Sequence, residues 1–202
     1  MKPLAQVRVQ ISEVIAGSAV PEDPRHSVNT LEWLLEFEPG ADEALQLAAL
    51  GHDIDRAVET SKVLRADFSD YDDFKAAHAR HSAEMLLEIL EQCGVGDPAL
   101  SDEVYRLVCL HEVGGDVRSE LLVDADSLSY FDVNLPLYRD RNSPEETFRR
   151  CVWGYRRLSR RARRIAAELH PPGDELALLM EEVVMRADKW DQPVSRRPAA
   201  FS

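Results

Sequence analysis

The sequence predicts an all-α protein, and three observations support this fold class. Apolar residues recur at intervals of three and four through most of the chain, the period of an amphipathic helix. Alternation of β-branched residues never lasts four positions outside such a context, so no segment is typical of a strand. The chain has 202 residues, 45% of them hydrophobic, which is enough to bury a sizeable core. We therefore expect a bundle of helices joined by short loops.

Capping residues and breaks predict where each helix begins and ends. Asp23 before Pro24 is typical of a helix start, and Gly17 and Pro39-Gly40 are typical of helix ends. Residues 59–70 are polar and irregular, so a long connection is expected there. The tail from Gln192 is rich in proline and arginine and is expected to be loose. The predicted helices cover about 4–16, 23–37, 42–58, 71–92, 102–111, 118–131, 144–168 and 174–188.

The composition excludes several classes of protein. No run of 18 apolar residues exists, so no membrane span is expected, and Arg8 and Glu13 interrupt the first 20 residues, which argues against a signal peptide. The three cysteines are widely spaced without a CxxC pair, which favours a reducing, cytoplasmic setting over disulfides or a cysteine zinc site. A formal net charge of -13 disfavours nonspecific binding to nucleic acid.

Charge is unevenly distributed along the chain. Residues 149–202 carry 12 basic and 7 acidic side chains, whereas residues 1–148 carry 12 basic and 30 acidic ones. Eight arginines fall within 149–164 with no acidic residue among them. This arginine-rich helix could be a solvated face neutralised by the acidic body, a rim that collects phosphate, or a surface for nucleic acid or an acidic partner.

The sequence feature with the clearest chemistry is an apolar helical segment that runs directly into His52-Asp53. Burying a carboxylate beside an imidazole is costly unless the two are paired or bind a cation. Imidazole nitrogen and carboxylate oxygen are suitable ligands for divalent Fe, Mn, Co, Ni, Zn or Mg, which the sequence does not distinguish.

The order of histidines and aspartates resembles the HD superfamily of metal-dependent phosphohydrolases over roughly residues 20–131. Its signature is a single histidine, a His-Asp doublet and a distant aspartate on a helical bundle. The positions that match are His26, His52-Asp53 and Asp126, with Asp124 as the alternative to Asp126. The resemblance implies an HD-type helical bundle with a C-terminal helical extension. It divides the chain into a metal-binding domain (1–140), an extension packed on it (141–190) and a flexible tail (191–202).

Two-metal branches of that superfamily have two further histidines between the doublet and the last aspartate. His78, with His81 as its alternative on the same helix face, and His111 before a glycine loop fit those places. The resemblance then implies one or two ions, with Asp53 as the bridge. The implied ligands are His26, His52, Asp53, His78, His111 and Asp126.

Each residue also has an interpretation without metal. His52-Asp53 could be an ion pair at a solvated helix end, and His26 could be an exposed first-turn residue. His78 and His81 could both lie on a polar helix surface. His111 could simply interact with the dipole at a helix C-terminus.

The resemblance implies hydrolysis of a phosphoester or phosphoanhydride. A metal ion lowers the pKa of bound water from about 15.7 toward about 7, and two ions can hold phosphate oxygens. Asp53, Arg56 and Glu112 are the implied catalytic residues: Arg56 could face the phosphate, and Glu112 or else Asp55 could carry a proton. The chain departs from many relatives at Ile54-Asp55-Arg56 and lacks the Gly-Tyr-Pro signature of cyclic-dinucleotide phosphodiesterases.

The resulting functional hypothesis is a metal-dependent phosphohydrolase that acts on a nucleotide or a similar small phosphorylated metabolite. The alternative is a catalytically inactive HD-type protein that binds metal and nucleotide as a sensor or regulator. A nucleic-acid adaptor built on the arginine-rich helix is a third hypothesis, which the net charge disfavours. The oligomeric state does not follow from the sequence.

Overall fold

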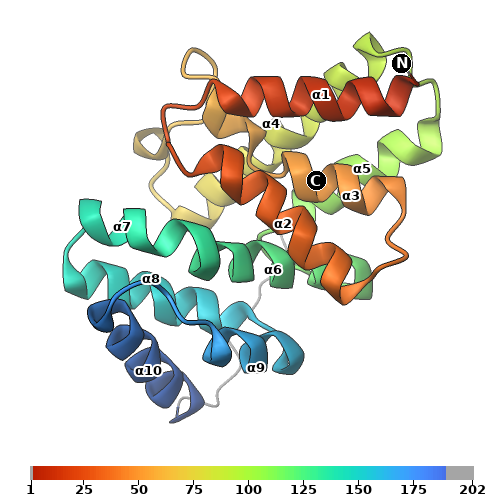
Figure 1. Cartoon of the computed structure of the whole chain (residues 1–202). Helices are drawn as coiled ribbons and strands as arrows, with labels where there is room; N and C mark the ends of the chain where they lie inside the picture. Colours follow the sequence, from red (N-terminus) through yellow and green to blue (C-terminus); the bar gives the residue numbers. More distant parts are fainter. Residues whose placement is uncertain (1, 190–202) are drawn as a thin grey trace.

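The helices expected from the apolar period are present in the computed structural model, which describes residues 2–189 (Figure 1). No strand occurs within that range, so the all-α prediction is confirmed. Residues 190–202, which include Trp190 and the predicted tail, lie outside the described part. The elements are α1 (Pro3–Ala16), α2 (Asp23–Phe37), α3 (Glu43–Gly51), η1 (Ile54–Ala57), η2 (Arg65–Asp67), α4 (Tyr71–Gln92), α5 (Pro98–Leu110), α6 (Val117–Ser129), η3 (Tyr130–Asn134), α7 (Leu135–Arg141), α8 (Pro144–Arg157), α9 (Arg160–Glu168) and α10 (Asp174–Lys189).

The third helix is shorter than the sequence predicted. It was expected to reach Val58, but α3 ends at Gly51 and a 3₁₀ turn, η1, follows. The backbone of Asp53, with φ -107° and ψ 15°, is no longer α-helical. The break therefore falls at the His-Asp doublet. Because the helix ends there, the adjacent side chains of His52 and Asp53 point in different directions.

The segment 144–168 forms two helices instead of the single one expected. Leu158 is extended, with ψ 141°, and the Ser159 side chain caps α9 by accepting a hydrogen bond from the Ala162 amide. Between α6 and α8 the sequence predicted no element beyond residue 131. The chain there forms a π-helical turn, η3, and then α7, which has a proline in its first turn.

The fifth helix also begins earlier than expected. It starts at Pro98 instead of residue 102, because the Asp97 side chain accepts hydrogen bonds from the amides of Ala99 and Leu100. An aspartate before a proline is the same start signal that the sequence carries at Asp23-Pro24.

Two groups of buried apolar side chains organise the bundle. The first lies among α1–α6, and the second lies among the end of α6, η3 and α7–α10. Helix α6 joins them, because Leu122 belongs to the first group and Leu128 to the second. Figure 1 shows α7–α10 gathered on one side of α6 and α1–α5 on the other. Helix α8 packs on α6 and α7, α9 packs on α6, and α10 packs on α8 and α9. The division at residue 140 stays a prediction.

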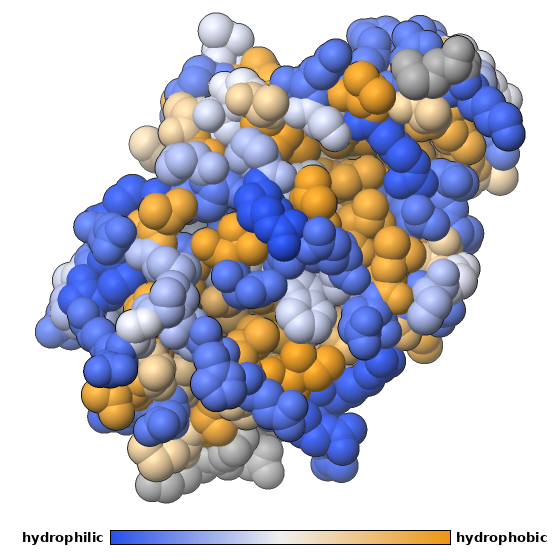
Figure 2. All heavy atoms as spheres, viewed as in Figure 1, coloured by the Kyte–Doolittle hydropathy of each residue, from blue (hydrophilic) through white to orange (hydrophobic). Residues whose placement is uncertain are grey.

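The surface in the same view is mixed. Figure 2 shows hydrophilic residues over much of this face, with apolar residues interspersed among them. None of the described helices is both long enough and apolar enough to cross a membrane.

A close approach between α3 and α4 fixes the position of the His-Asp doublet. A Cβ added at Gly51 would lie 2.4 Å from Leu86 Cδ2 and 2.9 Å from Cδ1, and Leu86 is buried. We expect Gly51→Ala to lower the free energy of unfolding by about 1–3 kcal/mol through overpacking. Urea titration measures this value.

A double-mutant cycle separates the clash from other effects. Leu86→Ala removes the atoms in question, so Gly51→Ala should cost much less in the Leu86→Ala background. An equal cost in both backgrounds would contradict the packing explanation.

Candidate metal centre

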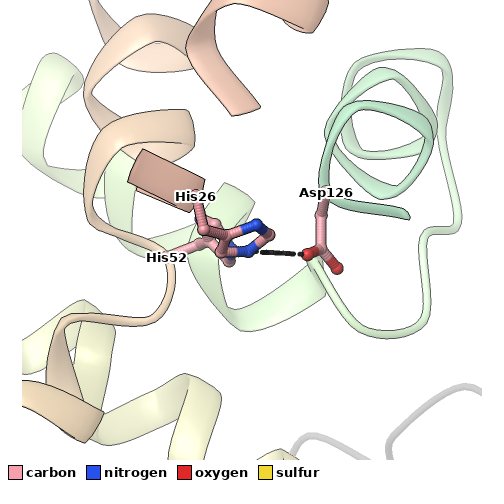
Figure 3. A group of neighbouring side chains, drawn as sticks. All are labelled: His26, His52 and Asp126. Carbon is pink, nitrogen blue, oxygen red and sulfur yellow. Dashed lines mark hydrogen bonds and ion pairs between the residues drawn. The ribbon is translucent and has the colours of Figure 1, made fainter. Parts of the chain in front are cut away.

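Three predicted ligands meet between α2, the end of α3 and α6. His26 and His52 lie side by side and face Asp126 from the other helices (Figure 3). The Asp126 Oδ1 atom is 3.3 Å from His26 Nε2 and 3.5 Å from His52 Nε2. One ligand atom from each residue lies within 4.8 Å of the other two. We call these three residues the first group.

Three further predicted ligands form a second group, made of Asp53, His78 and His111. Their ligand atoms also lie within 4.8 Å of one another. Asp53 Oδ1 is 2.8 Å from His78 Nε2 and 3.8 Å from His111 Nε2. His78 comes from α4 and His111 from the end of α5, so residues 25 to 58 positions apart in sequence converge here.

Asp53 faces both groups. While its Oδ1 atom faces the second group, its Oδ2 atom lies 3.9 Å from His26 Nε2 and 3.8 Å from His52 Nε2. A carboxylate with one oxygen toward each group is the arrangement that a bridging ligand requires.

The orientation of the histidine rings is fixed from behind. Nδ1 of His52 is 3.0 Å from the Ala49 carbonyl, and Nδ1 of His111 is 2.7 Å from the Val108 carbonyl. A carbonyl only accepts, so Nδ1 carries the proton in both rings, and Nε2 of a neutral ring is left as a free acceptor. Such partners orient histidine ligands in metal sites.

Two of the histidines, His52 and His78, carry strongly perturbed pKa values. Burial alone would lower the pKa of His52, but the charges of Asp53 and Asp126 outweigh burial and raise the pKa to about 9. Burial would likewise lower the pKa of His78, but hydrogen bonds to Asp53 and Asp55 raise it to about 9. Both rings therefore lie in surroundings that favour a positive charge.

The carboxylates show the complementary effect. Burial would raise the pKa of Asp53, yet the charges of Arg56 and His52 hold it well below its ordinary value of 3.8. Burial would raise the pKa of Asp126 too, and hydrogen bonds from His26 and His52 hold it well below 3.8. Ionised carboxylates with nitrogen donors in a buried cluster fit a divalent cation, which would take the place of the protons on the histidines.

Comparison with known proteins places the chain in a family. A model of the family described as a domain of unknown function (DUF4202) matches residues 10–179. The chain belongs to this family. No curated protein and no solved structure matches the chain. The matched region includes both groups of ligands and runs across the boundary predicted at residue 140, so in the DUF4202 family the helices on both sides form part of the shared sequence.

The structure distinguishes Asp126 from Asp124. Asp126 points into the first group, whereas the Asp124 side chain accepts a hydrogen bond of 2.8 Å from the Ser159 amide. Asp124 therefore holds the start of α9 against α6.

The structure also distinguishes His78 from His81. The two Nδ1 atoms contact different oxygens of the buried Asp55, but only His78 has its Nε2 atom in the second group. Asp55 also accepts a hydrogen bond from the Val63 amide. Both Asp55 oxygens are thus engaged in orienting histidines and the loop after η1, which suits a positioning residue better than a proton carrier.

A cavity of about 610 Å³ opens beside both groups in this DUF4202 member. Asp53, His78 and Asp126 line it, as do Arg56 and Glu112, the other two residues implied in catalysis. Arg56 lies 2.5 Å from Asp53 Oδ2 and 2.9 Å from Asp23 Oδ1. Glu112 pairs with Lys75 and lies 3.3 Å from His111 Nε2. Ion pairs therefore hold Arg56 and Glu112 next to the predicted ligands.

The sequence interpretation missed Arg157, a buried residue of the arginine-rich stretch. Its Nη2 atom donates a hydrogen bond of 2.9 Å to the His111 carbonyl and lies 3.5 Å from Asp126 Oδ2. Its Nη1 atom is 3.5 Å from Glu112 Oε2. A usable signal existed, because Arg150, Gly154 and Arg157 have the spacing of one helix face and the glycine allows close packing.

Proposed function

We propose that the protein is a metal-dependent phosphohydrolase that acts on a small organic phosphate such as a nucleotide. The observation that carries this proposal is Asp53, which directs one oxygen to each of two His/Asp groups at the wall of a large cavity. A bound divalent ion supplies a low-pKa water and positive charge for phosphate oxygens.

The residues of the chain would do the remaining work. His26, His52 and Asp126 would hold one ion, His78 and His111 a second, and Asp53 would touch both. Arg56 would keep the Asp53 carboxylate in place and present positive charge to the cavity.

Proton transfer falls to the pair of Glu112 and Lys75. Burial would raise the pKa of Glu112, but Lys75, His111 and Arg157 hold it well below its ordinary 4.5, so it is a carboxylate at neutral pH. Glu112 would accept the proton of the attacking water, and Lys75 would donate to the leaving oxygen.

The test is phosphate release by the full chain, stripped of metal and reloaded separately with Mn, Fe, Co, Ni, Zn or Mg. Substrates are nucleoside mono-, di- and triphosphates and a generic aryl phosphate. We expect phosphate release with at least one metal. We expect His52→Ala to abolish this release, because the buried His52 belongs to the first group.

The matched control is His170→Ala, which changes an exposed histidine outside the cavity lining and should keep full activity. The proposal would be refuted if none of the metals supported phosphate release, or if His52→Ala and wild type released phosphate at equal rates. Tight binding of metal and nucleotide without release would support the sensor hypothesis instead.

A further inference from the structure

Arg150, in α8, lines the same cavity as Asp53. Its guanidinium carbon lies 4.3 Å from the centroid of the Tyr130 ring and 4.5 Å from that of the Trp153 ring. Aromatic contacts use the faces of a planar guanidinium and fix its orientation. The N–H groups at its edge stay available for hydrogen bonds to an acceptor.

The other cations of the cavity wall are matched by protein groups. Arg65 is exposed and donates to the Phe68 carbonyl. The remaining four pair with carboxylates: Arg56 with Asp53, Lys62 with Glu59, Lys75 with Glu112, and Arg141 with Glu22. Among residues 2–189, Arg150 has no carboxylate within ion-pair distance, although it is half-buried. Its charge is therefore available to an anion in the cavity.

Asn134, in the π-helical turn that also carries Tyr130, is another residue that lines the cavity. Its side chain is buried, with 5% of the residue exposed, and within the described chain its Oδ1 atom has no hydrogen-bond partner. A buried acceptor oxygen without a donor is costly, and a hydroxyl or amino group of a ligand would relieve that cost. Single π turns inside helices are frequent at functional sites.

We propose that Arg150 forms a subsite for a second anionic group of the substrate, and that Asn134 Oδ1 accepts a hydrogen bond from a hydroxyl group of the same ligand. The substrate is then an organic phosphate that carries another phosphate or a carboxylate. One phosphate would bind at the metal ions beside Asp53, and the second anion would bind at Arg150. This inference rests on the proposed function for the role of the first phosphate.

Binding of matched ligand pairs to the full chain loaded with metal tests the subsite. One pair is adenosine 3′,5′-bisphosphate and adenosine 5′-monophosphate, and the other is 3-phosphoglycerate and glycerol 3-phosphate. Because charge-assisted hydrogen bonds stabilise the second anion, we expect wild type to bind the two-anion member of at least one pair about ten- to hundredfold more tightly. Calorimetry measures the dissociation constants.

The variants locate the effect. Arg150→Gln should lose the preference while keeping its affinity for the one-anion ligand, and Arg150→Lys should keep part of the preference. Arg149→Gln is the matched control, since Arg149 is the exposed neighbour on the same helix and pairs with Glu146. Equal loss in the two glutamine variants, or no preference in wild type for either pair, would overturn the subsite.

Binding and hydrolysis fail separately. A preference that depends on Arg150 without phosphate release supports the subsite and refutes the hydrolase. Release from one-anion and two-anion substrates with equal kcat/KM in wild type and Arg150→Gln supports the hydrolase and overturns the subsite.

Discussion

Asp53→Asn is expected to remove metal from both groups at once. Asparagine keeps the size of the side chain but loses the charge and one of the two acceptor oxygens, and Asp53 directs a separate oxygen to each group. The metal content per chain, measured by elemental analysis, should fall because neither group retains its ion. Phosphate release should fall about a thousandfold, the equivalent of about 4 kcal/mol of lost metal-ion stabilisation.

Two other variants give that result its meaning. His111→Gln changes the second group alone and should lower the metal content by no more than one ion per chain. Asp124→Asn makes the same chemical change at a buried aspartate outside both groups and should keep all of the metal. Equal metal content in Asp53→Asn and Asp124→Asn would exclude Asp53 as a bridge.

Much of the fold followed from local sequence signals. The apolar period located the helices, and Asp23-Pro24 marked the start of α2, although the cap residue is Glu22 instead of Asp23 and its side chain makes no capping hydrogen bond. One wrong prediction had a local signal, because Asp97 before Pro98 marks the earlier start of α5. Another, the single helix over 144–168, concerns a break stabilised by a contact between helices. Ser159 caps the start of α9, and its amide donates a hydrogen bond to Asp124, which lies 35 positions earlier in the sequence. Local propensity carries no information about such a partner.

The candidate site was predictable where it depends on residue identity and order. All six implied ligands lie in the two groups, and their role as ligands stays a prediction. The contacts that orient these ligands were harder to predict from the sequence. Asp55 looked like a possible proton carrier, whereas the structure places it between His78 and His81, because α4 turns both histidines toward η1. A helical face shows which residues share a side, and only packing shows what they meet.

Arg157→Met is expected to destabilise the metal-free protein strongly. Arg157 connects α8 to Asp126, to Glu112 and to the His111 carbonyl, and it is only 6% exposed. Methionine fills similar space without charge, so two buried carboxylates lose a counter-charge. Removing one partner from buried ion pairs costs about 3–5 kcal/mol. Urea unfolding in the presence of a chelator at pH 7 measures the difference.

The pH dependence of that difference has a definite sign. Burial would raise the pKa of Glu112, but cations that include Arg157 hold it well below 4.5. A depressed carboxylate pKa stabilises the fold above the unfolded value and loses that contribution as pH falls toward the folded value. The gap between wild type and Arg157→Met should therefore be full at pH 6–7 and shrink below about pH 4.5.

Arg164→Met is the control, because Arg164 belongs to the same arginine-rich stretch and is exposed. It should change the free energy of unfolding by less than about 0.5 kcal/mol. A gap for Arg157→Met that matches this control, or that grows on acidification, would contradict the electrostatic role. The predicted gap would mean that α8, which lies beyond the predicted metal-binding domain, is needed to hold the ligands in place.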